Sequence, residues 1–314
     1  MQVTHGTIQP QAGPTGFHCG LTIGNFDGVH RGHRAMLERL VQKARELRLA
    51  CAVLTFEPHP REFFAPQAAP ARLSRLREKL ECLAEEGVDR THVLPFGARL
   101  AGMSPERFVE DVLVAGLGVR WLIVGRDFRY GAKRAGDFAQ LQAAGERHGF
   151  SVEALEDVRE GGERISSSGV RAALAAGDLG AAARLLGRPY SMSGRVAHGE
   201  KLGRSLGFPT ANIVLRRRPA LQGIFAVEVE VEETHGRLRG VASVGRRPTV
   251  AAPGAAPLLE VHLFDWSGDL YGRHLRVTFA KKLRDEETYD GLEALRAAIA
   301  RDAAQAKEHF RSHG

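Results

Sequence analysis

The hydrophobic pattern of this chain changes character once along its length. From residue 19 to about residue 186, short β-rich runs alternate with stretches in which apolar residues recur at helical spacing. The β-rich runs are Cys19–Gly24, Ala50–Phe56, Thr91–Phe96 and Trp121–Gly125. Strand and helix in alternation predict a parallel α/β sheet covered on both faces, with ligands bound at the carboxyl ends of its strands.

Helices are predicted between these strands. Apolar residues recur at helical spacing from Met36 to Leu47 and again from Leu76 to Leu83. A further helix is expected at Ser104, because Ser caps free amides and Pro105 suits the first helical position.

The pattern changes near Gly187, which predicts a boundary between a domain of residues 1–186 and a domain of residues 187–314. Strand-like runs then follow one another without a helix: Phe225–Val231, Gly240–Val244, Leu258–Phe264 and Leu275–Phe279. This spacing indicates an antiparallel barrel or sandwich. A terminal helix is expected from about Tyr289 to Phe310, with Leu292, Leu295, Ile299 and Ala303 on one face.

Composition excludes several classes of protein. A length of 314 residues fits two domains at about 100–200 residues each. With 43% hydrophobic and 26% charged residues the chain is neither disordered nor fibrous, and no apolar run approaches the roughly 18 residues that span a bilayer. The first basic residue is Arg31, so a secretory signal with a basic start is not expected. The formal charge of +7 fits nucleic acid, a membrane surface or small anionic substrates equally well.

Cysteine usage points to a reducing environment. Cys19, Cys51 and Cys82 have neither metal-ligand nor redox-motif spacing. They are interpreted as buried thiols in a cytoplasmic protein.

The first chemical motif joins the first strand to its helix. It reads Ile-Gly-Asn-Phe-Asp-Gly-Val-His-Arg-Gly-His over residues 23–33. Its glycines allow a tight turn, the following helix offers free amides to a phosphate, and His30 and His33 can face the same anion. A metal site lacks a third ligand nearby, and two ordinary surface histidines are the simpler alternative.

Two later segments could complete a phosphate site. Ser166, Ser167 and Ser168 run into a helix that carries Arg171, and these groups can cap the helix or hold a phosphate chain. Asp127 follows a strand, where an α/β fold places its ligand loops. Taken alone, the first segment could be only a cap and the second only a turn.

A second glycine-rich motif, residues 194–213, opens the second domain. Its glycines let backbone amides wrap phosphates, but the Gly-Lys dipeptide of a Walker A loop is missing. Glu260 lies in an alternating strand, where it could act as a general base or simply face water.

The first motif and its companion segments resemble the adenylyltransferase module of prokaryotic bifunctional riboflavin kinase/FMN adenylyltransferases, also called FAD synthetases. The resemblance implies that His30 and His33 are catalytic and steady the α-phosphate of ATP. It implies an ATP site made of Gly24, Asn25, Phe26, Asp27, Gly28, His30, His33, Ser166, Ser167, Ser168 and Arg171. Asp127 would contact the flavin, although Asn is frequent there and Thr is usual at Ser168.

The second motif resembles the flavokinase signature, of which Pro-Thr-Ala-Asn at residues 209–212 is the most specific part. The implied ATP site is Gly194, His198, Gly199, Lys201, Gly203, Gly207, Pro209, Thr210 and Asn212. Thr210 and Asn212 would bind magnesium, Glu260 would be the general base, and Arg284 would contact flavin or phosphate. Ser243 replaces a frequent Asn.

The resemblance implies a nucleotidyltransferase-type parallel α/β domain followed by an antiparallel β-barrel with a terminal helix. The barrel would phosphorylate riboflavin with ATP, and the α/β domain would adenylylate the FMN to FAD with Mg²⁺ and release of pyrophosphate. Riboflavin, FMN and ATP are the expected partners, with no nucleic acid or membrane. A chain in which only the kinase works is one alternative. A flavin- or nucleotide-sensing nucleic-acid-binding protein is another, although aromatic residues make up only 7% of the chain.

Overall fold

The computed structural model describes residues 1–8, 18–199, 203, 206–232, 234, 236–245 and 256–313. By its contacts the chain forms two compact units. The first is Met1–Pro70 with Lys79–Ile165, and the second is Ala71–Glu78 with Ser166–Gly314. By their contacts, residues 166–186 therefore belong to the second unit. The functional domain boundary near Gly187 stays a prediction.

The first unit is built on a six-stranded sheet in the order β1-β4-β3-β2-β5-β6, and every neighbouring pair is parallel. The strands are β1 (Gln2–His5), β2 (Cys19–Ile23), β3 (Ala50–Glu57), β4 (Arg90–Pro95), β5 (Val119–Gly125) and β6 (Ser151–Leu155). The predicted parallel sheet is confirmed, and β1 and β6 are additional to the four expected strands. Strand order reverses beside β2, so a ligand crevice is expected beyond the carboxyl ends of β2 and β5.

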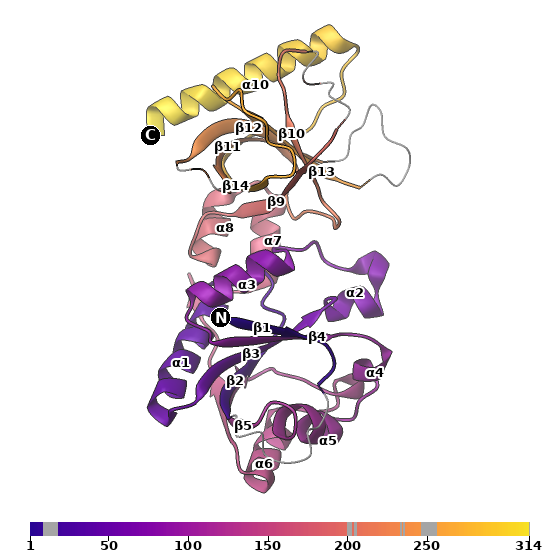
Figure 1. The fold of residues 1–314 in the computed structure, drawn as a ribbon, viewed down its shortest axis with the longest axis vertical. Helices are drawn as coiled ribbons and strands as arrows, with labels where there is room; N and C mark the ends of the chain where they lie inside the picture. Colours follow the sequence, from indigo (N-terminus) through magenta and orange to yellow (C-terminus); the bar gives the residue numbers. More distant parts are fainter. Residues whose placement is uncertain are drawn as a thin grey trace. The chain divides into compact units, whose positions relative to one another are not determined.

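Helices cover both faces of this sheet (Figure 1). On one face lie α1 (Arg31–Leu47) and the part of α3 (Leu76–Glu85) from Lys79 on, and their Leu37, Leu40 and Leu83 are fully buried. A π-helix (Phe108–Val114) and α6 (Phe138–His148) cover the other face. Shorter elements of this unit are α2 (Pro60–Phe64), α4 (Ala98–Ala101), α5 (Pro105–Arg107), two 3₁₀ turns (Pro66–Ala68 and Ala132–Arg134) and the paired strands β7 (Arg159–Glu160) and β8 (Glu163–Arg164).

Two helix starts show how the local sequence sets these elements. Ser104 accepts a hydrogen bond from the Arg107 amide at 3.3 Å and caps α5, as predicted. The ring of His30 does the same for α1 by accepting from the His33 amide at 3.3 Å. The first catalytic candidate is therefore also a helix cap.

The second unit contains a closed antiparallel barrel in the order β10-β13-β12-β11-β14-β9, which confirms a barrel rather than a sandwich. Its strands are β9 (Ser191–Ala197), β10 (Ala211–Val214), β11 (Gly223–Val231), β12 (Leu238–Gly245), β13 (Leu258–Leu263) and β14 (His274–Arg284). Two short helices, α7 (Ser167–Ala175) and α8 (Leu179–Leu186), precede it. The interior is filled by alternating apolar residues, among them Phe225, Val227 and Leu259.

The terminal helix α10 (Leu292–His313) packs against β11, β12 and β14 (Figure 1). Ala303, Ala306 and Phe310 are buried against the barrel wall. The helix begins three residues later than predicted from Tyr289, just after Gly291, whose φ of +108° departs from helical geometry.

The described residues form no helix that is both long and apolar enough to cross a membrane. Cys19 and Cys51 are buried as predicted, and Cys82 is half-buried. Burial raises the pKa of both buried thiols to about 12, so they remain protonated and unreactive.

Candidate active sites

The loop that follows β2 has an unusual backbone. Phe26, Gly28 and Val29 adopt φ values of +47°, +83° and +40°, which lie in the left-handed region. This region is strained for a β-branched residue such as Val29, whose side chain is fully buried. Strain of this kind persists only where the surroundings enforce it, and it concentrates at functional sites.

His30 and His33 are brought together by this loop and the first turn of α1. Their rings stack with centroids 3.7 Å apart, and the ring of Phe26 lies 5.0 Å from that of His33. The helix cap engages Nδ1 of His30, so a contact from His30 to a ligand would have to come from Nε2. Burial, then His30, then Lys79 lower the pKa of His33 well below its ordinary value, so His33 is neutral near pH 7.

Two buried polar atoms beside this loop lack a hydrogen-bond partner: Asn25 Oδ1 and His33 Nδ1. Native proteins rarely leave such atoms unsatisfied, so bound water or a ligand would supply their partners. Among the described residues, no cluster of three or more His, Cys, Asp or Glu residues could hold a metal ion. His33 Nδ1 can donate to a phosphate oxygen when it carries the proton of the neutral ring, whereas Asn25 Oδ1 can only accept a hydrogen bond.

Asp127 lies just beyond the carboxyl end of β5, at the expected crevice. Its carboxylate accepts a hydrogen bond from Arg164 at 2.8 Å, and this bond lowers the pKa of Asp127. Arg164 also pairs with Asp157 at 3.0 Å. The negative charge of Asp127 is thus balanced by an arginine that the sequence analysis did not identify.

The predicted serine segment begins α7. Ser166 accepts a hydrogen bond from the Gly169 amide at 3.2 Å and caps the helix. Ser167 is half-buried and Ser168 is exposed. Arg171 donates through Nε to the carbonyl of Ala71 at 2.7 Å.

Phe56 at the end of β3, Phe63 and Phe64 on α2, and Phe96 after β4 form an aromatic cluster that sequence reasoning missed. Phe96 lies 5.9 Å from Phe56, 5.8 Å from Phe63 and 5.6 Å from Phe64, centroid to centroid. Phe64 is 65% exposed and Phe63 is 39% exposed. The cluster therefore presents aromatic surface at the edge of the sheet where ligands are expected.

The barrel unit contains a cavity of about 430 Å³, large enough for a drug-sized ligand. It brings together four of the residues predicted for the kinase: Gly203, Thr210, Glu260 and Arg284. Apolar side chains from α10, including Leu292, Leu295 and Ile299, line another part of it. The cavity thus combines a polar side with an apolar side.

Three neighbouring strands place polar side chains in one row. Glu260 on β13 is directly opposite Asn212 on β10 and directly opposite Ser243 on β12. Directly opposed residues point to the same face of a sheet, so the proposed base, a proposed magnesium ligand and Ser243 lie side by side. Gly199 approaches this row so closely that an added Cβ would lie 2.5 Å from Nδ2 of Asn212.

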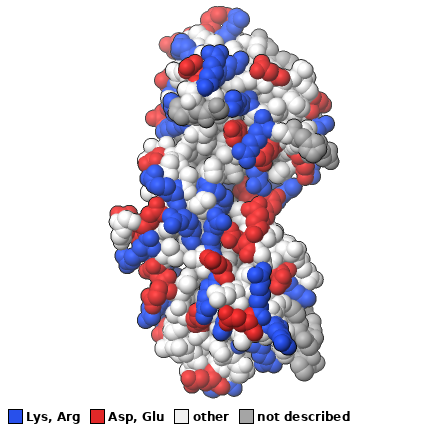
Figure 2. Space-filling view, turned by 90° about the vertical axis from the view of Figure 1, so that its left-hand side faces the viewer, with Lys and Arg blue, Asp and Glu red and all other residues white. Residues whose placement is uncertain are grey.

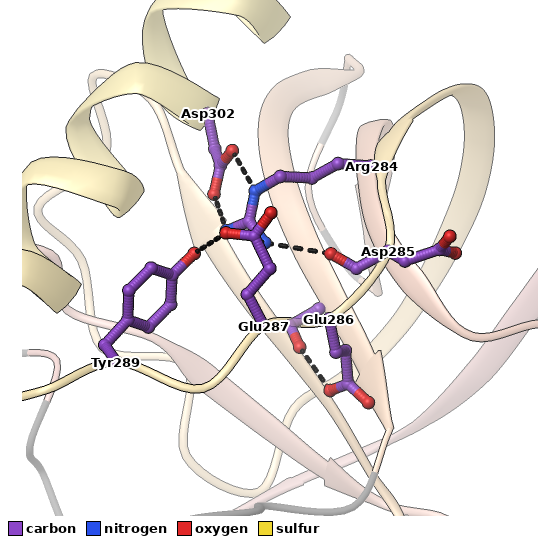
Figure 3. Close-up of polar contacts among 7 residues, drawn as sticks. Arg284, Asp285, Glu286, Glu287, Tyr289 and Asp302 are labelled. Carbon is purple, nitrogen blue, oxygen red and sulfur yellow. Dashed lines mark hydrogen bonds and ion pairs between the residues drawn. The ribbon is translucent and has the colours of Figure 1, made fainter.

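Arg284 borders the cavity, but its guanidinium is held by the protein itself (Figure 3). Nε and Nη2 donate to the two carboxylate oxygens of Asp302 at 2.8 and 2.6 Å, and Nη1 donates to the carbonyl of Asp285 at 2.9 Å. Asp302 lies on α10 and is 5% exposed. This pair therefore joins the end of β14 to the terminal helix.

Two further carboxylates lie on the same side of the cavity (Figure 3). Glu286 accepts a hydrogen bond from Ser243 at 3.4 Å, and Glu287 accepts one from the Tyr289 hydroxyl at 2.9 Å. Burial and then the charge of Glu260 raise the pKa of Glu286, while the Ser243 hydrogen bond opposes this rise.

The other kinase candidates that the structure describes are not among the residues that line the cavity. Gly194 sits in β9, where a Cβ would lie 2.5 Å from Arg75 and Ile213, so its smallness serves packing. The ring of His198 lies 4.0 Å from that of Tyr271. Gly207 has a φ of +86°, and the carbonyl of Pro209 bonds the ring of His262 at 2.9 Å. Lys201 lies outside the described residues.

One face of the molecule carries charges of both signs. On the face drawn in Figure 2, Lys and Arg are interspersed with Asp and Glu. Arg39 with Glu153 and Arg237 with Glu228 and Glu230 are examples of exposed or half-exposed pairs.

Comparisons with known proteins match both halves of the chain. A family model described as FAD synthetase matches residues 15–169, and one described as riboflavin kinase matches residues 186–310. The bifunctional riboflavin kinase/FMN adenylyltransferase of Escherichia coli (strain K12) is 52% identical over 293 residues, which cover 93% of each chain. The protein of the same description from Pseudomonas fluorescens is 52% identical and covers 92% of each.

A crystal structure described as a macrolide-efflux protein from Streptococcus pneumoniae has a TM-score of 0.79 and 26% identity. The alignment covers 96% of this chain and 97% of that one. Both modules of the sequence resemblance are thus matched in the expected order, and this chain belongs to the family of bifunctional riboflavin kinase/FMN adenylyltransferases.

Proposed function

We propose that the barrel unit phosphorylates riboflavin to FMN, and that the loop after β2 in the α/β unit takes part in adenylylating FMN to FAD. The observation that carries the proposal is the row in which Glu260 stands beside Asn212 at a cavity of about 430 Å³. Riboflavin would enter with its ring against the apolar side of this cavity and its ribityl chain toward Glu260.

In the kinase step Glu260 accepts the proton of the terminal ribityl hydroxyl as that oxygen attacks the γ-phosphate of ATP. ADP leaves, and the proton remains on Glu260 until it passes to water. The paired strands β10, β13 and β12 hold Glu260 at a fixed position. Such positioning of the reacting groups supplies most of the rate enhancement in phosphoryl transfer.

Magnesium fits the residues that border this row. Asn212 is buried, and Thr210 lines the cavity, so both offer hard oxygen atoms next to the place where phosphates would lie. Because Gly199 has no side chain, its backbone can pack directly against the Asn212 amide. When bound, Mg²⁺ neutralises charge on the phosphate oxygens.

In the adenylylation step the phosphate of FMN attacks the α-phosphate of ATP and pyrophosphate leaves. His33, kept neutral by burial, can donate a hydrogen bond to a phosphoryl oxygen without a net charge of its own. The amides at the start of α1 add a second set of donors. We assign the remaining predicted residues, Ser166, Ser167, Ser168 and Arg171, to the same ATP by their match to the family motif.

The aromatic cluster supports a place for the flavin of FMN. A flat isoalloxazine ring stacks on exposed aromatic side chains, and Phe64 offers such a surface beyond β3. Asp127, beyond β5, is proposed to contact the same flavin. A cytoplasmic location is proposed because all three cysteines are free thiols.

The test separates the two half-reactions. Wild-type protein incubated with riboflavin, ATP and Mg²⁺ should yield FMN and then FAD on chromatography. Glu260→Gln should abolish FMN formation but leave FAD synthesis from supplied FMN, and paired His30→Ala and His33→Ala should do the reverse. Glu230→Gln, on an exposed site of β11, is the matched control and should leave both reactions intact. Loss of both reactions in either folded variant would contradict the modular assignment.

A further inference from the structure

Lys79 is a fully buried lysine in the α/β unit, with 0% of its surface exposed. It lies on α3, which covers one face of the sheet near β3 (Figure 1). Lysines are almost never fully buried unless they are paired, because removing an ammonium from water is costly. Neither the resemblance nor the mechanism above gives Lys79 a role.

The contacts of Lys79 lead to the loop after β2. Its Nζ donates to Oγ1 of Thr55 at 3.3 Å, and Oγ1 of Thr55 donates to the carbonyl of Asn25 at 3.4 Å. Thr55 is also fully buried, near the carboxyl end of β3. The hydroxyl has one hydrogen to give, so the direction of this chain is fixed: ammonium to hydroxyl to carbonyl.

The carbonyl at the end of this chain belongs to the strained loop. Asn25 directly precedes Phe26, the first of the three residues with left-handed φ values. A hydrogen bond from a charged donor is stronger than one between neutral groups, and a relay of such bonds polarises each member. The buried ammonium is therefore placed to hold Asn25 in the conformation from which the strained turn begins.

The same charge acts on the site electrostatically. After burial and His30, Lys79 is the third cause that lowers the pKa of His33. A fixed cation in a dry interior attracts incoming phosphates without reorganising at the moment of reaction.

We propose that Lys79 is a positioning residue for adenylyl transfer, which acts through Thr55 on the carbonyl of Asn25 and so fixes the phosphate-binding loop. The proposal rests on the assignment of this loop to ATP. It gives α3 a role in this site.

The test uses a matched pair at Thr55 and one change at Lys79. Thr55→Val removes the hydroxyl at nearly constant shape, Thr55→Ser keeps it, and Lys79→Met removes the charge from a chain of similar length. FAD formation from supplied FMN is measured against ATP concentration, so that the kinase step does not contribute. Riboflavin phosphorylation by the same molecules reports on the integrity of the barrel unit.

We expect Thr55→Val and Lys79→Met to raise the KM for ATP by about ten-fold or more, with a smaller change in kcat, because a charge-assisted contact is lost. Thr55→Ser should stay within about two-fold of wild type, since a serine hydroxyl can make the same relay. Riboflavin phosphorylation should be unchanged in all three.

Two results would overturn the proposal: unchanged adenylylation in Thr55→Val, or equal losses in Thr55→Val and Thr55→Ser together with a lower melting temperature. If Lys79→Met does not fold, the comparison of Thr55→Val with Thr55→Ser tests the proposal without it. A wild-type protein that formed no FAD would instead contradict the proposed function.

Discussion

The ion pair between Arg284 and Asp302 should control both the stability of the barrel unit and its affinity for riboflavin. In Asp302→Asn, the amide oxygen can still accept from Nε of Arg284. The amide NH₂ group then faces Nη2 of Arg284, so two hydrogen-bond donors oppose each other. The nearest other carboxylate, on Glu287, lies 3.7 Å from Nη1. Asp302→Asn thus leaves the guanidinium without its main partner.

The magnitude follows from burial. Breaking a fully buried ion pair costs about 3–5 kcal/mol. The side chain of Asp302 is 7% exposed but that of Arg284 is 23% exposed, so part of the charge stays hydrated and about 2–3 kcal/mol is expected. The same helix supplies Leu292, Leu295 and Ile299 to the cavity. Loosening its first turns should weaken riboflavin binding about ten-fold, or about 1.4 kcal/mol.

The assay can isolate the barrel unit. The chain has two tryptophans, Trp121 in the α/β unit and Trp266 in the barrel unit, so in a Trp121→Phe background the fluorescence of Trp266 reports barrel unfolding in urea. Riboflavin binding is followed by titration. Asp285→Asn is the matched control, because that side chain is 83% exposed and should change stability by no more than about 0.5 kcal/mol. Equal stability and equal riboflavin affinity in Asp302→Asn and Asp285→Asn would refute the reasoning.

Further predictions concern both sites. Phe64→Ser should raise the KM for FMN in FAD synthesis while leaving stability nearly unchanged, because the ring is 65% exposed; an unchanged KM would argue against flavin stacking there. In Gly245→Ala the new Cβ would overlap the carboxylate of Glu286, so the KM for riboflavin should rise about ten-fold and FAD formation from FMN should not change. Because the pKa of His33 is lowered in the folded state, the unfolded chain binds more protons just below pH 6.5, and the free energy of unfolding should fall as pH decreases from there. Urea titrations should show a weaker pH dependence in His33→Asn.

Elements with a strong periodic pattern were predictable from sequence. The run Ala50–Phe56 holds Val, Leu, Thr and Phe in succession, and the structure has β3 at Ala50–Glu57. By contrast, β9 contains Ser, Gly and Arg, and it becomes a strand because β10 and β14 pair with it on either side. β1 has only four residues, which are largely exposed, and exists through its pairing with β4. Such strands depend on tertiary contacts that no local pattern encodes.

The same division holds for the candidate sites. His30, His33 and Asn212 lie within short motifs, so sequence could identify them as candidates, whereas the pairing of Glu260 with Asn212 and Ser243 follows from the barrel register. The Arg284–Asp302 pair joins residues 18 positions apart on different elements, and the Lys79–Thr55 contact joins residues 24 positions apart. A lysine in an amphipathic helix is normally solvated, so only the burial of Lys79 distinguishes it.

The segment Ala71–Glu78 has a consequence for the order in which the protein folds during synthesis. It lies in the first half of the chain but belongs to the second unit, where Leu73 enters the barrel core and Arg75 donates to the carbonyl of Val214 at 2.7 Å. The α/β unit can close once Ile165 has left the ribosome, whereas these eight residues must wait for strands that are made much later. A kinase expressed from Gly187 onward would lack them altogether, so its barrel should be easier to unfold than the barrel of the whole chain.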